Sequence, residues 1–575
     1  MNNQEIIKRA KQWLHPSFDE KTRSEAQRLI DENGQDLLEA FHKDLDFGTG
    51  GLRGIMGVGT NRVNIYTIGM ATQGLANYLK KSFTDETNQP IGVAIAHDSR
   101  NNSAVFARKC AEILAANGFD AYLFESLRPT PELSYAVRKK NCKAGIVITA
   151  SHNPSEYNGY KVYWEDGAQL IPPHDNNVIA EVRKITTPDQ VKTDYRSWNI
   201  IPLGIETDRN YWDSIASVAS EQHESNLKVV YTPIHGTGVK SIPQVLDLLG
   251  YQHVEVLADQ AIPDGNFPTV DSPNPEEAAA LKLAICRAQN VNADLVLGTD
   301  PDADRVGIAV KDNEGKFVLL NGNQTAAILV NYMLKKWKTS GGIDGNQYIC
   351  KTIVTTELLT EIADHFGVKT YNTLTGFKWI AELIRKKEGR EKFIVGGEES
   401  YGYLIDDFVR DKDAVLSSVM ICEAAAEAKK AGSTLYNELL GIYRDIAFYK
   451  ERLISITKKG IEGSSEIQKM MSELRSNPPK TVAGIEVELL RDYQSQEELN
   501  FFNHSIKGIE LPKSNVIQLV LRDGSIITAR PSGTEPKIKF YLSVKGDKLK
   551  SIEAFEASNA LLESKMDALL KDLNL

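Results

Sequence analysis

The chain has 575 residues, of which 42% are hydrophobic and 25% charged, and its formal net charge is −10. A single hydrophobic core stops growing near about 250 to 300 residues, so a chain of this length should form several domains. The composition excludes disordered and fibrous classes, and the negative charge disfavours nucleic acid as the main partner, because that polyanion requires a basic face.

The N-terminal stretch is polar and charged, and no apolar run approaches the roughly 20 residues that span a bilayer. We therefore expect a soluble, cytoplasmic protein that does not bind membranes. The cysteines form no CxxC pair, which predicts reduced and mostly buried thiols. They lie far apart in the chain, at Cys110, Cys142, Cys286, Cys350 and Cys422.

Short apolar runs recur along the chain, and each ends abruptly in a stretch rich in Gly, Asp or Ser. Their near-continuous Val, Ile and Leu content predicts buried strands of parallel sheets covered on both faces, so the fold class is α/β. The runs lie at residues 91–100, 144–154, 227–238, 293–305 and 392–402.

Segments with helical periodicity lie between these strands, such as the apolar stripe at Ala326, Leu329, Val330, Met333 and Leu334. A further helix is predicted from an N-cap at Asp413 to Gly432. The last part of the chain differs, because strands separated by short turns are followed by a closing helix. This pattern predicts a small α+β domain with an antiparallel sheet.

A serine loop, TASHNP, closes the strand at 144–154 and contains Ser151 and His152. Neighbours in an extended chain point to opposite faces, so we do not expect these two side chains to form a hydrolase dyad. An ordinary Ser/Asn/Pro turn is the alternative for this hexapeptide considered alone.

An acidic loop, DPDADR, follows the apolar run LVLG and places carboxylates at Asp300, Asp302 and Asp304. Alternation along an extended segment would point all three the same way, and oxygen ligands favour Mg²⁺. A solvated acidic turn remains the alternative. An EF-hand fails because its sixth and twelfth positions are Arg305 and Lys311, and Asp304 weakens an aspartyl-phosphate loop, which needs Thr or Val there.

Two further loops carry groups suited to a phosphosugar. Glu398 and Glu399 lie between glycines after a buried strand, where carboxylates could accept hydrogen bonds from sugar hydroxyls, although adjacent glutamates are usually a solvated pair. The stretch RPSGTEP offers an arginine fork, hydroxyl donors and a glycine that permits close backbone approach to a phosphate. A tight turn with an exposed arginine is its alternative. The relevant residues of this loop are Arg530, Ser532, Gly533 and Thr534.

TASHNP, DPDADR, GEES and RPSGTEP occur in this order, and with them the sequence closely resembles the α-D-phosphohexomutase family of phosphoglucomutases and phosphomannomutases. The resemblance begins at FGTGGLRG, residues 47–54, and implies four domains in a heart-shaped arrangement. Three would be related α/β domains and the last an α+β domain. The expected boundaries are residues 1–205 with an N-terminal helical extension and the phosphoserine loop, 206–322 with the metal loop, 323–448 with the sugar-binding loop, and 449–575 with the phosphate-binding loop.

The resemblance implies an intramolecular phosphotransferase of the isomerase class, in which Ser151 is phosphorylated. A phosphate oxygen on Ser151 would join Asp300, Asp302 and Asp304 around one Mg²⁺ per chain. Donation of the phosphate to the substrate would give a 1,6-bisphosphate, and the other phosphate would then return to Ser151. Glucose 1,6-bisphosphate is thus the expected activator and intermediate.

By the same resemblance, Arg53 and Arg305 would assist the transfer. His152 and Lys161 are the candidates for general acid/base work, with Lys161 preferred. A lysine in that role needs a lowered pKa, which metal and arginine neighbours would favour. The expected substrate-binding residues come from four motifs: Thr375, Gly376 and Lys378 of a TGxK loop, Glu398 and Ser400, Lys412 of an R-E-K-D-like stretch, and Arg530, Ser532, Gly533 and Thr534.

Glucose is the expected sugar, because the GEMSGH loop of dual phosphomannomutases is altered here. Glu399 and Tyr401 replace its Met and Gly, and Gly402 stands in place of its histidine, which excludes a role for that histidine. Glucose and mannose differ by one hydroxyl, and one neutral hydrogen bond nets only about 0.5 to 1.5 kcal/mol. Phosphomannomutase and phosphopentomutase activities therefore stay as alternatives, with a silent sugar-phosphate sensor and a plain phosphatase as rivals from other classes. A monomer and a dimer are both compatible with the sequence.

Overall fold

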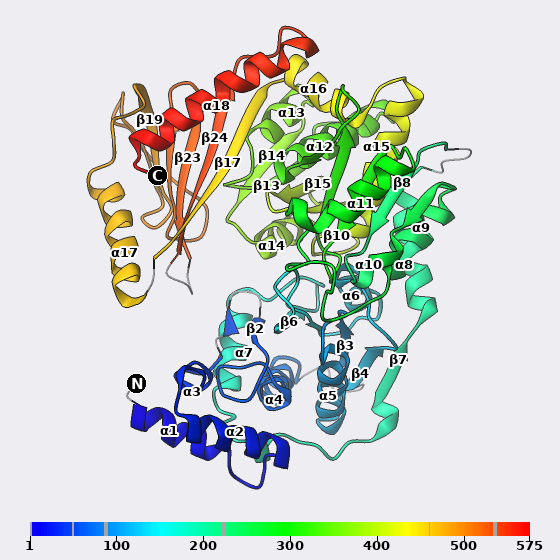
Figure 1. Cartoon of the computed structure of the whole chain (residues 1–575), viewed down its shortest axis with the longest axis vertical. Helices are drawn as coiled ribbons and strands as arrows, with labels where there is room; N and C mark the ends of the chain where they lie inside the picture. The colour runs from blue at the N-terminus through cyan, green and yellow to red at the C-terminus, as the bar shows by residue number, and fades with distance from the viewer. Residues whose placement is uncertain are drawn as a thin grey trace. The chain divides into compact units, whose positions relative to one another are not determined.

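A computed structural model describes residues 3–45, 47–48, 51–84, 90–220, 225–458, 460–532 and 537–575. The chain forms two compact units. Figure 1 labels helices and strands of both and colours them from the N-terminus to the C-terminus. The first comprises Met1–Ala309 and Gly402–Ala426, and the second comprises Val310–Tyr401 and Glu427–Leu575. In the described ranges, no helix combines the length and apolar character needed to cross a membrane.

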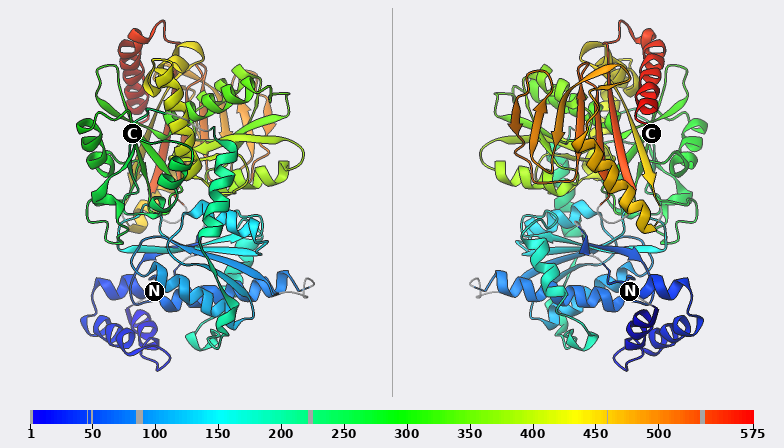
Figure 2. Two further views of the ribbon diagram at one scale, coloured as in Figure 1. Left: turned by 90° about the vertical axis from the view of Figure 1, so that its right-hand side faces the viewer. Right: turned by 90° about the vertical axis from the view of Figure 1, so that its left-hand side faces the viewer.

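The first unit begins with three short helices that share a small core around Trp13 and Phe41 (Figure 2, dark blue). The side chain of Asp19 caps α2 by accepting a hydrogen bond from the Thr22 amide, and the Tyr66 hydroxyl donates to the same carboxylate. This contact joins the helical extension to α4. The helices are α1 (Asn3–Gln12), α2 (Glu20–Glu32) and α3 (Gln35–Phe41).

A seven-stranded sheet follows, with the order β1-β2-β6-β5-β3-β4-β7. Alternation along β3 sends Val93 and Ile95 into a core with α4, α5 and α7, and Ala94 and Ala96 into a core with α6. The predicted strands β3 and β5 pair in parallel, as expected. The sheet as a whole is mixed, because β6, which was not among the predicted strands, runs antiparallel to β5. The elements are β1 (Phe47–Gly48), β2 (Gly51–Ile55), α4 (Ile65–Ser82), β3 (Gly92–His97), α5 (Ser103–Ala116), β4 (Asp120–Phe124), α6 (Thr130–Lys139), β5 (Ala144–Ile148), β6 (Tyr157–Trp164), α7 (His174–Val182) and β7 (Ile200–Leu203).

A second sheet of this unit is built on β8, which pairs in parallel with both β9 and β10. Strand β10 is buried throughout and ends immediately before the acidic loop. The elements are α8 (Ile205–Val218), β8 (Val229–Thr232), α9 (Ile242–Leu248), β9 (Val254–Val256), α10 (Ala258–Ala261), α11 (Ala278–Asn290), β10 (Leu295–Thr299), β11 (Val306–Lys311), β16 (Gly402–Ile405) and α15 (Ala414–Lys430), of which β11 and α15 cross the unit boundary.

The second unit contains a sheet in which β13 pairs in parallel with β14 and β15. Helix α12 begins at a capping box formed by Asn321 and Gln324, and its predicted apolar stripe is buried, as expected. The elements are β12 (Phe317–Leu320), α12 (Gly322–Thr339), β13 (Gln347–Thr352), α13 (Leu358–Phe366), β14 (Lys369–Thr373), α14 (Phe377–Lys387), β15 (Lys392–Glu398) and α16 (Leu435–Asp445).

The C-terminal part of this unit is a sheet whose core order is β17-β24-β23-β22-β19-β20-β21, with all its described pairs antiparallel. The closing helix α18 packs against β17 and β24, which confirms the predicted α+β pattern. The elements are β17 (Phe448–Thr457), α17 (Gly460–Ser476), β18 (Thr481–Val482), β19 (Ile485–Asp492), β20 (Glu497–Asn500), β21 (Ile506–Gly508), β22 (Ile517–Leu521), β23 (Ile526–Pro531), β24 (Lys537–Gly546) and α18 (Phe555–Asp572).

Candidate functional site

The serine loop leaves β5 and turns sharply at Ser151, whose φ of 53° lies in the left-handed region. The Ser151 amide donates to the Thr149 hydroxyl at 2.8 Å, and its Oγ donates to Asp300 Oδ2 at 2.8 Å. The same Oγ lies 3.1 Å from His152 Nδ1. The expectation that neighbouring Ser151 and His152 side chains diverge was therefore wrong, because this backbone is not extended.

Arg100, which the sequence interpretation did not single out, forms hydrogen bonds with the backbone of the serine loop. Its guanidinium donates to the carbonyl oxygens of Ser151 at 2.6 Å and Pro154 at 2.8 Å. The only sequence signal was its place in HDSR, at the end of the strand run 91–100. Such polar strand ends in α/β sheets tend to face ligands or the loops that bind them.

The three aspartates converge, although through a turn and not through the extended segment that we expected. Residues 301–304 lie between β10 and β11, and Ala303 has a φ of 51°. One carboxylate oxygen from each of Asp300, Asp302 and Asp304 lies within 4.8 Å of the others, and all three side chains are buried. Amides of Asp304 and Arg305 donate to Asp300 Oδ1 at 3.1 and 3.0 Å, which fixes the turn.

The charge of this cluster is only partly compensated by the protein. Burial raises the pKa of Asp300 well above its usual range, and the adjacent Asp302 and Asp304 carboxylates raise it further. Asp304 is the opposite case: burial favours its neutral form, yet Lys161, Lys412 and Arg305 hold its pKa below the usual value. Asp302 Oδ1 and Asp304 Oδ1 are buried and receive no hydrogen bond within the described ranges. Orphaned carboxylate oxygens in such a cluster fit a hard divalent cation.

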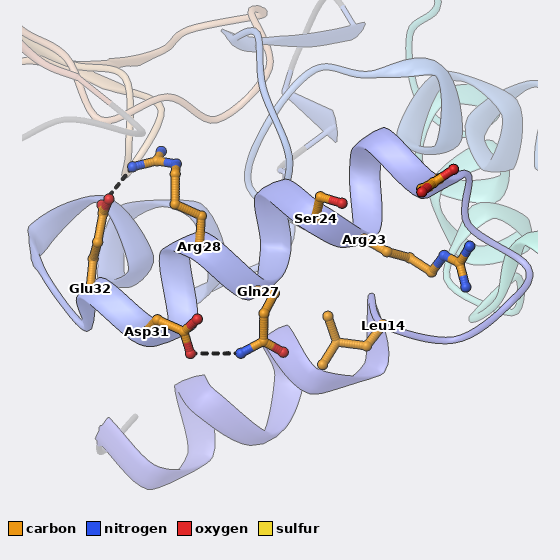
Figure 3. Close-up of a pocket in the computed structure, with 8 residues that line it drawn as sticks. Leu14, Arg23, Ser24, Gln27, Arg28, Asp31 and Glu32 are labelled. Atoms are coloured by element: carbon orange, nitrogen blue, oxygen red, sulfur yellow. Dashed lines mark hydrogen bonds and ion pairs between the residues drawn. The ribbon is translucent and has the colours of Figure 1, made fainter.

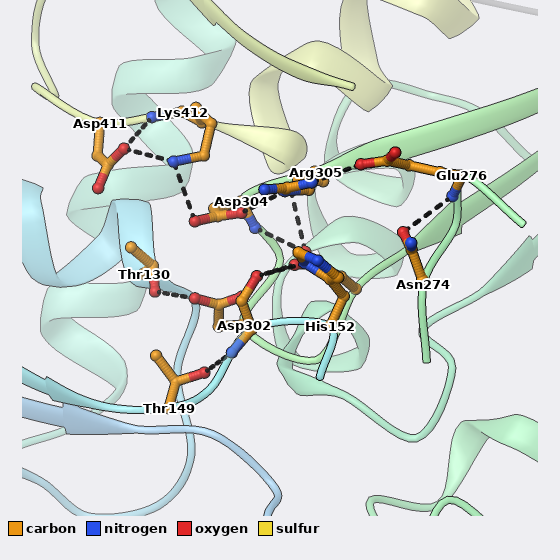
Figure 4. A network of polar contacts seen from close by, with 12 residues as sticks. Thr130, Thr149, His152, Asn274, Glu276, Asp302, Asp304, Arg305, Asp411 and Lys412 are labelled. Carbon is orange, nitrogen blue, oxygen red and sulfur yellow. Dashed lines mark hydrogen bonds and ion pairs between the residues drawn. The ribbon is translucent and has the colours of Figure 1, made fainter. Parts of the chain in front are cut away.

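Two segments of the first unit brace the acidic loop. The Thr130 hydroxyl, at the start of α6, donates to Asp302 Oδ2 at 2.9 Å (Figure 4). The Thr237 amide donates to the Pro301 carbonyl at 2.8 Å. Gly236 lies so close to Pro301 that a Cβ there would come within 2.5 Å of Pro301 Cα. Gly236 and Thr237 lie at the polar end of the predicted strand run 227–238, whereas Thr130 lies at the start of a helix. The sequence analysis assigned a role to none of the three.

Two lysines meet the acidic loop. Lys161 Nζ donates to Asp302 Oδ2 at 2.7 Å and to Asp304 Oδ2 at 3.2 Å. Lys412 Nζ lies 3.2 Å from Asp304 Oδ2 and 2.9 Å from Asp411 Oδ1 (Figure 4). Burial lowers the pKa of Lys161, but Asp302 and Asp304 outweigh it and the net direction is upward. This upward direction belongs to the protein without a metal ion, and the lowered pKa expected beside a bound metal and arginine neighbours stays a prediction.

The two arginines and the histidine complete the cationic side of this site. Arg305 pairs with Glu276, and Arg53 donates to the Asn153 side chain at 3.3 Å. Burial lowers the pKa of His152 well below its usual range, and the charges of Arg305 and Arg53 act in the same direction. His152 is thus neutral near pH 7 and can accept a proton from its neighbour Ser151.

The second unit holds the residues predicted to bind the sugar. Glu398 ends β15 and accepts a hydrogen bond from the Gly376 amide at 2.9 Å, so the TGxK loop and the glutamate loop meet. Lys378 is buried, with Nζ 5.1 Å from the centroid of the Trp379 ring. The partly exposed Thr375 and Ser400 belong to the same two loops.

The predicted phosphate loop is described only at its ends. Arg530 lies in β23 opposite Lys539 of β24, and Ser532 is exposed. Burial raises the pKa of Tyr541 to about 12, with Glu399 adding to the shift and Arg530 opposing it. Tyr541 thus interacts with both the glutamate loop and this arginine. The predicted residues Gly533 and Thr534 lie outside the described residues.

A groove of about 790 Å³ lies on the N-terminal helices (Figure 3). Its polar groups largely satisfy one another, as in the pairs Arg28 with Glu32 and Gln27 with Asp31. None of the predicted site residues lines it, so we assign it no part in the chemistry. The lining residues are Leu14, Glu20, Arg23, Ser24, Gln27, Arg28, Asp31 and Glu32.

Comparison with known proteins agrees with this arrangement. Family models for the phosphoglucomutase/phosphomannomutase α/β/α domains I, II and III match residues 44–189, 209–315 and 321–443. A phosphoglucomutase of Staphylococcus aureus MRSA252 is 39% identical over 548 residues, covering 95% of this chain and 96% of the relative. One of Staphylococcus epidermidis RP62A is 38% identical over 520 residues, covering 90% and 93%.

Solved structures share the fold. The Paramecium phosphoprotein pp63/parafusin, a phosphoglucomutase in an open form, superposes with a TM-score of 0.67 at 17% identity, covering 91% of this chain and 94% of that one. A phosphoglucomutase/phosphomannomutase family protein from Burkholderia thailandensis gives 0.65 at 18% identity, covering 92% and 97%. With three matching domain models and relatives near 40% identity over almost the whole length, the chain belongs to the phosphoglucomutase/phosphomannomutase family of α-D-phosphohexomutases.

Proposed function

We propose that this protein is a phosphoglucomutase that interconverts glucose 1-phosphate and glucose 6-phosphate through a phosphoserine at Ser151. The observation that carries the proposal is the hydrogen bond of 2.8 Å from Ser151 Oγ to Asp300, in a buried cluster of three carboxylates. A serine at this position has a proton acceptor beside it, and the carboxylates could hold a cation that offsets the charge of a phosphoryl group. The relatives named phosphoglucomutase, at 38 to 39% identity, support glucose as the sugar.

In this proposal the first unit supplies the transfer chemistry. Ser151 Oγ is the atom that gives and receives the phosphoryl group, and His152 Nδ1 at 3.1 Å can take the hydroxyl proton. Lys161 carries its proton in the ion pairs with Asp302 and Asp304, so it enters the reaction as a cation. It stays the preferred candidate for general acid/base work, which requires a pKa nearer the working pH. Arg53 and Arg305 offer guanidinium groups to the phosphoryl oxygens.

Asp300, Asp302 and Asp304 would hold one Mg²⁺, which supplies positive charge that offsets the charge on a transferring phosphoryl group. Lys412 Nζ contacts Asp304 and Asp411 beside the proposed metal site. The substrate-binding role that the sequence predicts for Lys412 stays a proposal.

The second unit supplies the groups suited to sugar and phosphate. Glu398 keeps one carboxylate oxygen on the Gly376 amide and has further acceptor capacity for sugar hydroxyls. Thr375, Lys378 and Ser400 are its partners in this role, and Arg530 with Ser532 is proposed to hold the phosphate that is not being transferred. The proposed activator is glucose 1,6-bisphosphate.

The test is conversion of glucose 1-phosphate by enzyme primed with glucose 1,6-bisphosphate, measured with and without added Mg²⁺. We expect glucose 6-phosphate as the product, turnover that depends on Mg²⁺, and little free phosphate. Absence of turnover by primed enzyme would sink the mutase proposal, and free phosphate released as fast as substrate disappears would support a phosphatase instead. Mannose 1-phosphate and ribose 1-phosphate, tested in parallel by kcat/KM, rank the alternative sugars.

A further inference from the structure

The guanidinium group of Arg100 forms hydrogen bonds with backbone carbonyl groups along the serine loop. Arg100 is buried. Its Nη2 donates to the carbonyl oxygens of Ser151 and Asn153, and its Nη1 donates to those of Pro154 and Tyr157. Backbone carbonyls that accept from one planar fork must all point at the same place. The course of residues 151–157 is therefore set by this side chain.

The guanidinium is itself held from its other sides. Its Nε lies 3.2 Å from Asp98 Oδ2, and neither side chain has any exposed surface. Asp98 Oδ1 accepts from the Arg100 amide and from the Ser103 hydroxyl, and the Phe267 ring lies with its centroid 5.0 Å from Arg100 Cζ. A side chain fixed in this way can act as a rigid support for the loop.

Ser151 is the residue that most needs such support. Its left-handed backbone, uncommon outside Gly and Asn, is what turns Oγ toward both Asp300 and His152. Its own carbonyl is one of the four that Arg100 holds. Release of that carbonyl would allow the turn to relax toward an extended backbone, in which the Oγ direction changes.

We propose that Arg100 is a positioning residue that keeps the phosphoryl group of Ser151 aligned for transfer to the sugar and not to water. The inference rests on the proposed phosphoserine mechanism. In the competing reaction a water oxygen bonds to phosphorus, the phosphorus–Oγ bond breaks, Oγ regains a proton, and inorganic phosphate leaves. Arg100 touches neither reacting atom, so its effect is on alignment, to which transfer is more sensitive than attack by mobile water.

The discriminating variant is Arg100→Lys, which keeps the positive charge beside Asp98. Its single ammonium group replaces the planar guanidinium and cannot donate hydrogen bonds to all four carbonyl oxygens in the same geometry. The matched control is Arg128→Lys. Arg128 is also buried and bonds Asp208 through Nε and Nη2, both at 2.8 Å, but its carbonyl contacts lie at residues 126 and 127.

Each enzyme is phosphorylated with glucose 1,6-bisphosphate and cleared of ligand. Loss of the protein's phosphoryl group is then followed by intact-protein mass spectrometry in water alone, and transfer is followed in a rapid-quench turnover with glucose 1-phosphate. We expect Arg100→Lys to lower the transfer rate by about 100-fold and to raise the ratio of hydrolysis to transfer by at least about tenfold. Arg128→Lys should leave that ratio at the wild-type value even if it lowers stability.

A folded Arg100→Lys enzyme with the wild-type ratio would overturn the inference. If this variant does not fold, Phe267→Leu takes its place, because it removes the ring from the guanidinium and spares the hydrogen bonds; a smaller rise in the same ratio supports the inference, and an unchanged ratio overturns it. Failure of the wild-type enzyme to carry or transfer phosphate would instead reject the proposed function, so the two failures are distinguishable.

Discussion

The contact between Gly236 and Pro301 makes a quantitative prediction for Gly236→Ala. A Cβ on residue 236 would lie 2.5 Å from Pro301 Cα and 2.8 Å from the Pro301 carbonyl oxygen. Ordinary contact begins near 3.4 Å, so the Pro301 backbone must retreat by about 0.9 Å, the difference between 3.4 and 2.5 Å. Both atoms are backbone, so a change of rotamer cannot relieve the overlap.

That displacement falls between Asp300 and Asp302, two of the three proposed ligands. Mg²⁺ requires near-ideal octahedral geometry, and ligand sets lose function when displaced by more than about 0.5 Å. We expect the dissociation constant for Mg²⁺ to rise at least about tenfold, which is about 1.4 kcal/mol. Overpacking should also lower the free energy of unfolding by about 1 to 3 kcal/mol.

Isothermal titration of Mg²⁺ into metal-stripped, phosphorylated enzyme measures this effect without relying on activity. The control is Gly441→Ala, because residue 441 lies inside α16 and a Cβ there meets nothing within 4 Å. Folded Gly236→Ala enzyme that binds Mg²⁺ with wild-type affinity would refute the reasoning, as would an equal loss of affinity in Gly441→Ala.

Three further changes test other parts of the account. In Gly402→Ala the new Cβ would lie 2.1 Å from Lys412 Cδ, so the lysine should leave Asp304 and kcat/KM for glucose 1-phosphate should fall at least about tenfold; a wild-type value in steady-state kinetics would contradict this. Lys378→Ala should raise KM about tenfold with little change in kcat, and a loss confined to kcat would count against a binding role. Burial, and then Glu398, raises the pKa of Glu399 to about 7, so the folded state retains a proton that the unfolded state loses near 4.5. Stability should therefore fall as pH rises from about 5 to 7, by up to about 3 kcal/mol, and Glu399→Gln should flatten this dependence in denaturation curves recorded across that range.

The sequence was sufficient to predict the fold where the pattern was local. Continuous apolar runs identified the buried strands, and Asp413 does cap α15, accepting hydrogen bonds from the amides of Val415 and Leu416. The antiparallel C-terminal sheet followed from short turns between strands. Strand β6 was missed, because its sequence YNGYKVYW mixes polar residues with apolar ones and forms no continuous Val, Ile and Leu run.

The candidate site was predicted in its residues but not in its geometry. The prediction that alternate side chains share a face assumes an extended backbone. Ser151 and Ala303 instead adopt left-handed φ values, which Ser and Ala rarely adopt and which the sequence therefore did not predict. The ion pair of Lys161 with Asp302 was also beyond the sequence pattern, because the two residues are more than a hundred positions apart in the chain. Arg100 was not predicted, because its hydrogen bonds are with backbone carbonyl groups of a loop about fifty residues further along the chain.

The central claim is that the phosphoryl group on Ser151 is passed to the sugar. It is tested most directly with enzyme carrying a ³²P-labelled phosphate on Ser151, mixed for one turnover with unlabelled glucose 1-phosphate, with Ser151→Ala as the control that should take up no label. The account predicts that the label appears first in glucose 1,6-bisphosphate and then in glucose 6-phosphate. Product formation while the label stays on the protein, or is released as inorganic phosphate, would contradict it.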